Sequence, residues 1–132
     1  MAITEIEGLL YKAGRVTLDS SGNGVITLDP ASARERWEVE SVVVSTSQAA
    51  TATTVPVATV GKNTSVVSQL SQANNHGQSW SGNQDVFTGR IDISPADYLS
   101  ILFSPPPGNN GAALSGVIAY ATVTGKRYTR RA

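Results

Sequence analysis

The sequence predicts an all-β protein: a single β-sandwich of seven or eight short strands, with the jelly roll as a candidate topology. Val, Ile and Thr supply 34 of the 132 residues, whereas Leu supplies 8 and Met 1. β-branched side chains are restricted at χ1 and fit a pleated strand well. Short alternating runs recur about every eight to twelve residues between Gly, Pro, Asn and Ser clusters, a spacing typical of sandwiches and barrels. A chain of this length forms one domain with its own core.

The first fourteen residues differ from the rest, and we expect either a short helix or an extended arm there. Their apolar residues recur at three- and four-residue steps, and Thr4 with Glu7 could form a capping box. Gly8 and Gly14 weaken a helix, and an arm lying on a neighbour would use the same apolar residues. The expected division is an N-terminal arm (1–14), a β-sandwich (15–125) and a basic C-terminal tail (126–132).

The next segments predict a hairpin, a loop and a long strand. Residues 15–19 and 25–29 flank Ser20–Gly24, whose Gly and Asn residues tolerate the positive φ values of a tight turn. We expect a helical turn or loop over residues 30–36. Residues 37–47 alternate as a strand that begins at a polar rim and ends buried on both faces.

The second half of the chain predicts the remaining strands and two surface loops. We expect residues 51–60 to pair with the long strand. Pro56 places this segment at a sheet edge or a bulge, because proline cannot donate a ladder hydrogen bond. Residues 71–84 and 104–111 are polar or rich in Pro and Gly, and are expected to be loops. The other expected strands are residues 64–70, 86–94, 97–103 and 114–125.

Charge and hydropathy exclude several classes of partner. Only 15% of the residues are charged and the formal net charge is zero, against about 25% charged in a typical soluble domain. A nucleic-acid partner is therefore not expected. The N-terminus lacks the basic region of a secretory signal peptide, and no apolar run approaches the ~18 residues of a membrane span. We expect a protein made in the host cytoplasm with no membrane partner.

No arrangement of side chains predicts catalysis, a metal site or a cofactor. The chain has no cysteine and one histidine, His76, whose neighbours are loop formers. Glu38 and Glu40 have the spacing of a solvated strand rim, and Asp97 follows a Ser-Pro-Ala turn, so neither they nor Asp92 predict a glycosidase pair. We expect a protein that is not an enzyme.

The two chain ends and one loop carry the candidate contact residues. The last seven residues hold four basic side chains, leaving 6 basic against 10 acidic residues in the rest. Such a tail can dock on an acidic surface or remain a solvated end. Trp80 in its polar loop can anchor a glycan or a protein, or fold back to close one end of the sandwich. The expected partner-binding residues are Ile3, Ile6, Leu9, Leu10, Lys126, Arg127, Arg130 and Arg131, and the expected loop contacts are Trp80 and Asn83.

Several stretches between about residues 15 and 128 carry a resemblance to a known class of protein. They include WEVESVVVSTS (37–47), TVPVATV (54–60), SWSGNQDVFTG (79–89), DYLSILF (97–103) and GVIAYATVTG (116–125). In pattern and composition they resemble small virion structural proteins of tailed phages that infect actinobacteria. No catalytic or ligand motif accompanies the resemblance.

The resemblance implies a non-enzymatic β-sandwich that works as part of a virion. The first expectation is a capsid decoration or minor capsid protein, a homotrimer whose arm or tail binds the major capsid protein of the shell. The second is a minor tail or receptor-binding protein in which Trp80, Tyr98 or Tyr120 contacts cell-surface glycan. A free-standing carbohydrate-binding module is a third.

Overall fold

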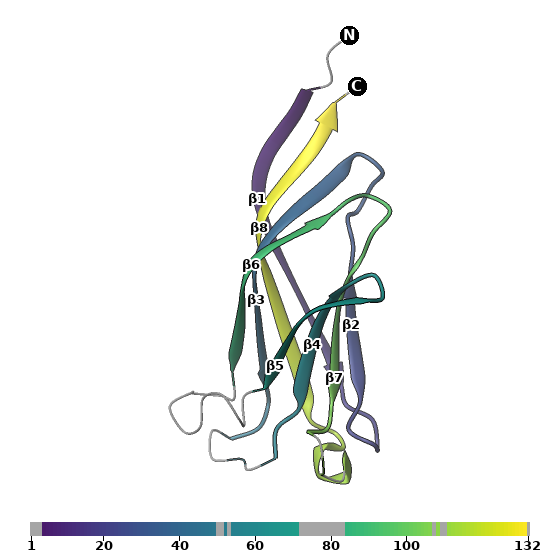
Figure 1. Cartoon of the computed structure of the whole chain (residues 1–132), viewed down its shortest axis with the longest axis vertical. Helices are drawn as coiled ribbons and strands as arrows, with labels where there is room; N and C mark the ends of the chain where they lie inside the picture. The colour runs from purple at the N-terminus through teal and green to yellow at the C-terminus, as the bar shows by residue number, and fades with distance from the viewer. Residues whose placement is uncertain are drawn as a thin grey trace.

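Eight strands form two antiparallel four-stranded sheets (Figure 1). The computed structural model describes residues 4–49, 52, 54–71, 84–106, 108 and 111–131, with the backbone alone at residues 66–71 and 131. The strands are β1 (Thr4–Thr17), β2 (Gly24–Leu28), β3 (Glu35–Thr46), β4 (Val57–Lys62), β5 (Ser65–Ser71), β6 (Asp85–Ile93), β7 (Leu99–Ser104) and β8 (Ile118–Arg131), with a 3₁₀ turn, η2 (Gly111–Leu114), before β8. The predicted all-β sandwich is confirmed.

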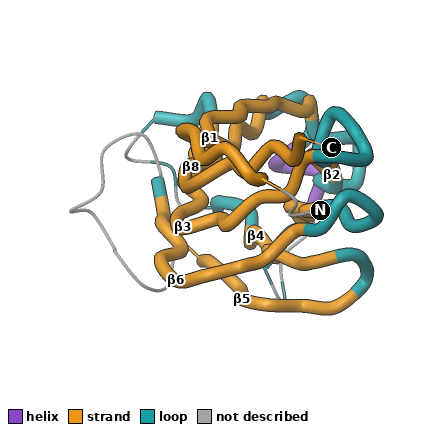
Figure 2. The backbone as a smooth tube through the Cα atoms, turned by 90° about the horizontal axis from the view of Figure 1, so that it is seen from above, coloured by secondary structure: helices purple, strands orange, loops and turns teal. Residues whose placement is uncertain are grey.

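The strand order is that of a jelly roll. One sheet has the order β1-β8-β3-β6 and the other β2-β7-β4-β5, so the chain crosses repeatedly between two layers, as in an eight-stranded jelly roll. The view along the long axis shows the two layers, with β5 and β6 side by side where their edges meet (Figure 2).

The core lies between the inner faces of the two sheets. In β7, Leu99, Ile101 and Phe103 are fully buried, and in β8 Ala119 and Val123 are equally buried. Successive side chains of a strand point to opposite faces, and the intervening residues of both strands are exposed or half-buried. The alternation read from the sequence for these two strands is therefore confirmed.

The N-terminal segment is a strand, and the helical alternative is wrong. β1 pairs with β8 over its whole length, from Thr4 opposite Arg131 to Thr17 opposite Ile118. The side chains of neighbouring residues therefore lie on opposite faces of the sheet: Leu10 is 3% exposed and Leu9 is 87% exposed. β1 and β8 also run without interruption across the boundaries expected after residues 14 and 125.

The turn after β1 links the two sheets, so the expected hairpin is also wrong. β1 pairs with β8 and β2 pairs with β7. The turn itself is where the sequence places it: the Asp19 carboxylate accepts hydrogen bonds from the backbone N–H groups of Ser21 (2.9 Å) and Asn23 (3.0 Å). Turn-forming residues therefore mark a change of direction without identifying the partner strand.

β4 lies in the other sheet from β3, contrary to the expectation for residues 51–60. It pairs with β5 and β7 and is an interior strand. Pro56 directly precedes the first residue of β4, Val57, so its missing N–H does not interrupt a ladder. A register shift in β4 occurs later, between Val60 and Gly61.

A bulge in β3 changes which of its side chains face the core. The register with β6 and β8 shifts between Val39 and Ser41. Trp37 and Val39 are buried before the shift, and Val42 and Val44 are buried after it. The expected burial of both faces near the end of this strand does not occur, because the outward residues there are only half-buried.

Candidate functional site

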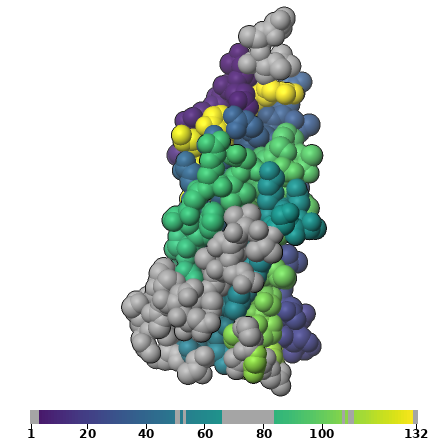
Figure 3. Space-filling model, in the orientation of Figure 1, coloured from purple at the N-terminus to yellow at the C-terminus, as the bar shows by residue number. Residues whose placement is uncertain are grey.

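β1 and β8 bring the predicted arm and tail residues together at one end of the molecule (Figures 1 and 3). We call residues 4–9 of β1 with residues 126–131 of β8 the terminal ribbon. In its register Glu5 lies opposite Arg130, and Leu9 lies opposite Lys126. Acidic and apolar residues of β1 thus lie beside basic residues of β8.

The predicted contact residues fall into different environments within this ribbon. Leu9 is 87% exposed and Ile6 is 43% exposed. Arg127 and Arg130 are exposed, and Lys126 is half-buried. Leu10 belongs to the core, so its prediction as a contact residue is wrong. Ile3 lies outside the described residues, and Arg131 is described only by its place in β8.

A network of charged and aromatic side chains joins both strands of the ribbon to β3. Arg36 of β3 donates from Nε and Nη2 to the two carboxylate oxygens of Glu5, at 2.8 and 2.9 Å. Its guanidinium lies 4.1 Å from the ring centroid of Tyr128, within range of a cation–π contact. The Tyr128 hydroxyl donates to Glu7 Oε1 at 3.2 Å.

The contacts within this network shift the pKa values of Glu5 and Tyr128. The hydrogen bond from Arg36 lowers the pKa of the Glu5 carboxyl. The carboxylate of Glu38, followed by burial and the carboxylate of Glu7, raises the pKa of Tyr128 to about 12, because nearby negative charge favours the neutral phenol. At neutral pH Glu5 is therefore ionised and Tyr128 protonated.

The described basic side chains of β8 differ from Glu5 of β1 in that they form no ion pair. Within the described part of the chain, Lys126, Arg127 and Arg130 make no ion pair with a carboxylate. Glu5, in contrast, is held by Arg36. The ribbon therefore presents basic side chains outside ion pairs next to exposed aliphatic surface, a combination that suits a partner surface with carboxylates around an apolar patch.

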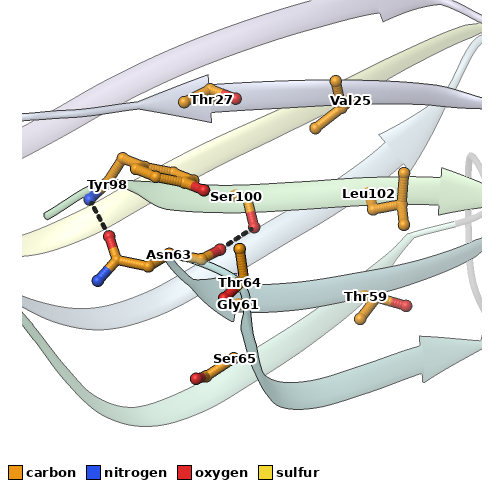
Figure 4. Close-up of a pocket in the computed structure, with 10 residues that line it drawn as sticks. All are labelled: Val25, Thr27, Thr59, Gly61, Asn63, Thr64, Ser65, Tyr98, Ser100 and Leu102. Atoms are coloured by element: carbon orange, nitrogen blue, oxygen red, sulfur yellow. Dashed lines mark hydrogen bonds between the residues drawn. The ribbon is translucent and has the colours of Figure 1, made fainter.

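The outer face of the other sheet carries a groove of about 400 Å³ (Figure 4). Its lining includes hydroxyl, amide, aromatic and aliphatic side chains and no charged one. Val25 and Leu102, 51% and 45% exposed, form its apolar part. The lining residues are Val25, Thr27, Thr59, Gly61, Asn63, Thr64, Ser65, Tyr98, Ser100 and Leu102.

One wall of the groove is held by Asn63, which has a positive φ of 55° in the turn between β4 and β5. Its side-chain oxygen accepts from the Tyr98 backbone N–H at 3.0 Å, and its amide nitrogen donates to Asp97 Oδ1 at 2.9 Å. The Asp97 carboxylate also accepts from the Ser94 hydroxyl at 2.6 Å. Asp97 is therefore a structural anchor for this wall.

The groove has the chemistry of a site for a neutral polyhydroxy ligand, because hydroxyl and amide groups surround an aromatic ring without a charge among them. It contains Tyr98, one of the three aromatic residues predicted to contact glycan. Tyr120 lies on the other sheet, in β8, so the two tyrosines do not form one site. Trp80 and Asn83 lie outside the described residues.

Sequence reasoning missed three parts of these surfaces. Tyr11 is 69% exposed beside Leu9, and its apolar ring at an outward strand position is the signal that could have found it. The roles of Arg36 and Tyr128 depend on pairing between distant strands and leave no local pattern.

The described residues offer neither a cluster of metal ligands nor a helix that could span a membrane. These residues contain no cluster of three or more His, Cys, Asp or Glu side chains able to hold a metal ion. None of their helices has the length and apolar character needed to cross a bilayer.

Comparison with known proteins relates the fold of this chain to that of a phage capsid chain. No family model matches the chain, and neither does any curated protein. Among solved structures, a chain from the acid-stable capsid of the Helicobacter pylori bacteriophage KHP30 aligns with a TM-score of 0.55 and 11% identity. The alignment covers 97% of this chain and 93% of that one. The two chains therefore share one fold over nearly their whole lengths.

Proposed function

We propose that this chain is a non-enzymatic structural protein of a phage virion, a decoration or minor capsid protein that binds the major capsid shell. The observation that carries the proposal is the agreement in fold, over 97% of this chain, with a chain of a phage capsid. The sequence resemblance to phage virion proteins supports the same class independently. The actinobacterial host and the trimeric state remain predictions.

The terminal ribbon is the part of the molecule best suited to bind the shell. It extends beyond the rest of the sandwich (Figure 1) and carries Ile6, Arg127 and Arg130 on exposed positions. The predicted tail residues are not free, because β8 pairs with β1 there and Arg36 of β3 binds Glu5. A pre-ordered contact loses less entropy on binding than a flexible one, and repetition over a shell adds avidity.

Binding to empty shells of the parent phage tests this proposal. We expect the variant Arg127→Gln/Arg130→Gln to lower occupancy, measured by co-sedimentation. The control, Thr17→Glu/Thr88→Glu, lowers the net charge by the same two units at exposed positions outside the ribbon. Equal occupancy for wild type and the ribbon variant would refute the proposed contact.

The groove favours a second candidate function, a tail or receptor-binding protein, or a carbohydrate-binding module, that binds glycan. The observation in its favour is the uncharged lining around Tyr98. Tyr98→Ala should then abolish binding to purified cell-wall polysaccharide, whereas Tyr120→Ala on the other sheet should not. Copy number separates the virion roles: a decoration protein is present in hundreds of copies per particle, and a tail-tip protein in a few.

A further inference from the structure

β1 has a free edge that is well suited to pairing with another strand. It is the terminal strand in the order β1-β8-β3-β6, and among the described strands its backbone pairs with β8 only. Proteins usually block such an edge with proline, a bulge or a very short strand. β1 has 14 residues, contains no proline, and pairs with β8 without a register shift.

The outward face of β1 has a self-complementary order of side chains. Leu9 and Tyr11 at its centre are 87% and 69% exposed. Acidic residues precede this apolar pair and a basic residue follows it. In chain order the outward residues are Glu5, Glu7, Leu9, Tyr11, Ala13 and Arg15. When two copies of this strand lie antiparallel, the acidic end of each therefore faces the basic end of the other.

We propose that two copies of this chain pair antiparallel through their β1 edges, about a two-fold axis at Leu10. In this register Leu9 lies opposite Tyr11 of the second copy, and Glu5 lies opposite Arg15 of the second copy. Each contact occurs twice, as an isologous interface requires. The two sheets then join into one continuous sheet.

Other registers match less well. Sliding one strand by a single residue along the other would place outward residues opposite inward ones, because side chains alternate with a period of two. The remaining choices move the two-fold axis to another residue of the strand. Centring the axis on Leu9 leaves Arg15 without an acidic residue opposite it. Centring it on Tyr11 restores an ion pair, with Glu7, but separates Leu9 from the aromatic ring. The register centred on Leu10 alone satisfies both the charges and the apolar pair.

Arg15 is available for this contact. Its side chain is exposed, and it forms no ion pair within the described part of the chain. Glu5 already binds Arg36 at 2.8 Å and lies opposite Arg130, so Arg15 of the second copy would join these two cations around the carboxylate. A second copy satisfies this charge order automatically, whereas an unrelated strand would have to match it residue by residue.

The self-pairing goes beyond the proposed function and does not rest on it. Both contacts include residues 4–9 of β1, but they are tested at different places: Arg127 and Arg130 of β8 for the shell contact, and Arg15, outside the terminal ribbon, for the self-pairing. A two-fold contact can coexist with a three-fold contact elsewhere, as in assemblies that combine both axes.

Disulfide trapping tests the register, because the chain contains no cysteine. We expect a mixture of Leu9→Cys chains and Tyr11→Cys chains to form a mixed disulfide dimer under mild oxidation, faster than either variant alone. A mixture of Val25→Cys and Leu102→Cys, exposed residues of the other sheet, serves as the control. Crosslinking at the control rate would overturn the proposed register.

Charge reversal tests the interface itself, by sedimentation equilibrium without shells. We expect Arg15→Glu to raise the Kd of the two-fold contact roughly tenfold, because it places a carboxylate opposite Glu5 of the second copy. Thr88→Glu/Ser115→Glu, which lowers the net charge by the same two units at exposed positions outside β1, is the matched control. A protein that stays monomeric at high concentration, or a Kd unaffected by Arg15→Glu, would refute the contact, and neither outcome bears on shell binding.

Discussion

Arg36 reaches over strand β8 to bind Glu5 of strand β1, with its guanidinium 4.1 Å from the ring centroid of Tyr128. The three residues belong to three adjacent strands. The inward residues of β8 at this level, Arg127 and Thr129, are exposed, whereas Trp37, opposite Arg127 on β3, belongs to the core. Side chains on the outer face therefore add to the strand pairing that holds β1 and β8 to β3 at this end of the sheet.

Replacing Arg36 with Ala should loosen the terminal ribbon without unfolding the sandwich. We expect faster amide hydrogen exchange at residues 5–8 and 127–130 and little change in the thermal midpoint, because local opening requires less free energy than global unfolding. Arg90→Ala is the control, since Arg90 binds Glu38 and Asp92 and does not contact β1. Unchanged exchange in the ribbon would show that strand pairing alone holds it.

Gly125→Ala should destabilise the protein strongly, because β8 approaches β3 closely at the bulge. A Cβ at Gly125 would overlap the carbonyl oxygen of Glu38 and lie 2.9 Å from the Glu40 nitrogen. We expect a loss of about 1–3 kcal/mol, as for other overpacked positions, measured by urea denaturation. Gly8→Ala on β1 is the control: its nearest neighbour would be Arg127 Nη2 at 3.8 Å, so its unfolding midpoint should stay close to wild type.

Glu35→Ala should cost more stability than Glu35→Gln. Trp37, 1% exposed, donates its indole N–H to Glu35 Oε2 at 2.7 Å, and Glu35 is itself 8% exposed. Removing the acceptor leaves a buried donor unpaired, at a cost of about 1–3 kcal/mol, whereas glutamine keeps a carbonyl oxygen. Urea denaturation of both variants measures the difference. Equal losses would mean that the carboxylate itself, which both variants remove, decides stability rather than the acceptor oxygen that glutamine keeps.

Asp97 should remain ionised in acid that protonates ordinary aspartates. The hydrogen bond from Asn63, followed by those from Ser94, holds its pKa well below the usual range. A carboxyl whose pKa is depressed by folding stabilises the native state above its unfolded pKa of about 3.9, and this contribution is lost as the pH falls through the folded pKa. NMR titration of the carboxyl carbon should show this, and Asn63→Ala should raise the pKa.

The pH experiment has a control in the turn after β1. Asn23→Ala removes another loop asparagine far from Asp97 in sequence and should leave the Asp97 pKa unchanged. An ordinary Asp97 pKa in the wild-type protein would mean that the Asn63 hydrogen bond does not form in solution.

The sequence predicted strands correctly where polar and apolar residues alternate, because this pattern can be recognised without knowing the partner strand. Leu99, Ile101 and Phe103 could be assigned to the core from their spacing. The N-terminal segment could not be assigned, because its secondary structure depends on pairing with β8, more than a hundred residues away. The bulge after Val39 likewise depends on two neighbouring strands and leaves no mark on the local pattern.

The candidate surfaces were predictable only in part, for the same reason. Exposed Leu9 and Arg127 could be selected as contacts from composition and charge. Leu10 could not be excluded until the strand placed it inside the sandwich. The groove around Tyr98 combines residues of four strands and two connecting segments that are separate in sequence, so no single stretch predicts it.

The pairing of β1 with β8 also sets an order of events during synthesis. β1 is made before every other strand of this fold, and its partner is made after all of them. A nascent chain therefore carries an unpaired, partly apolar strand until translation of β8 is complete, and such strands are prone to premature association. Ribosome stalling before β8 should thus yield chains that associate wrongly. Correct assembly therefore requires that translation of β8 follows without delay.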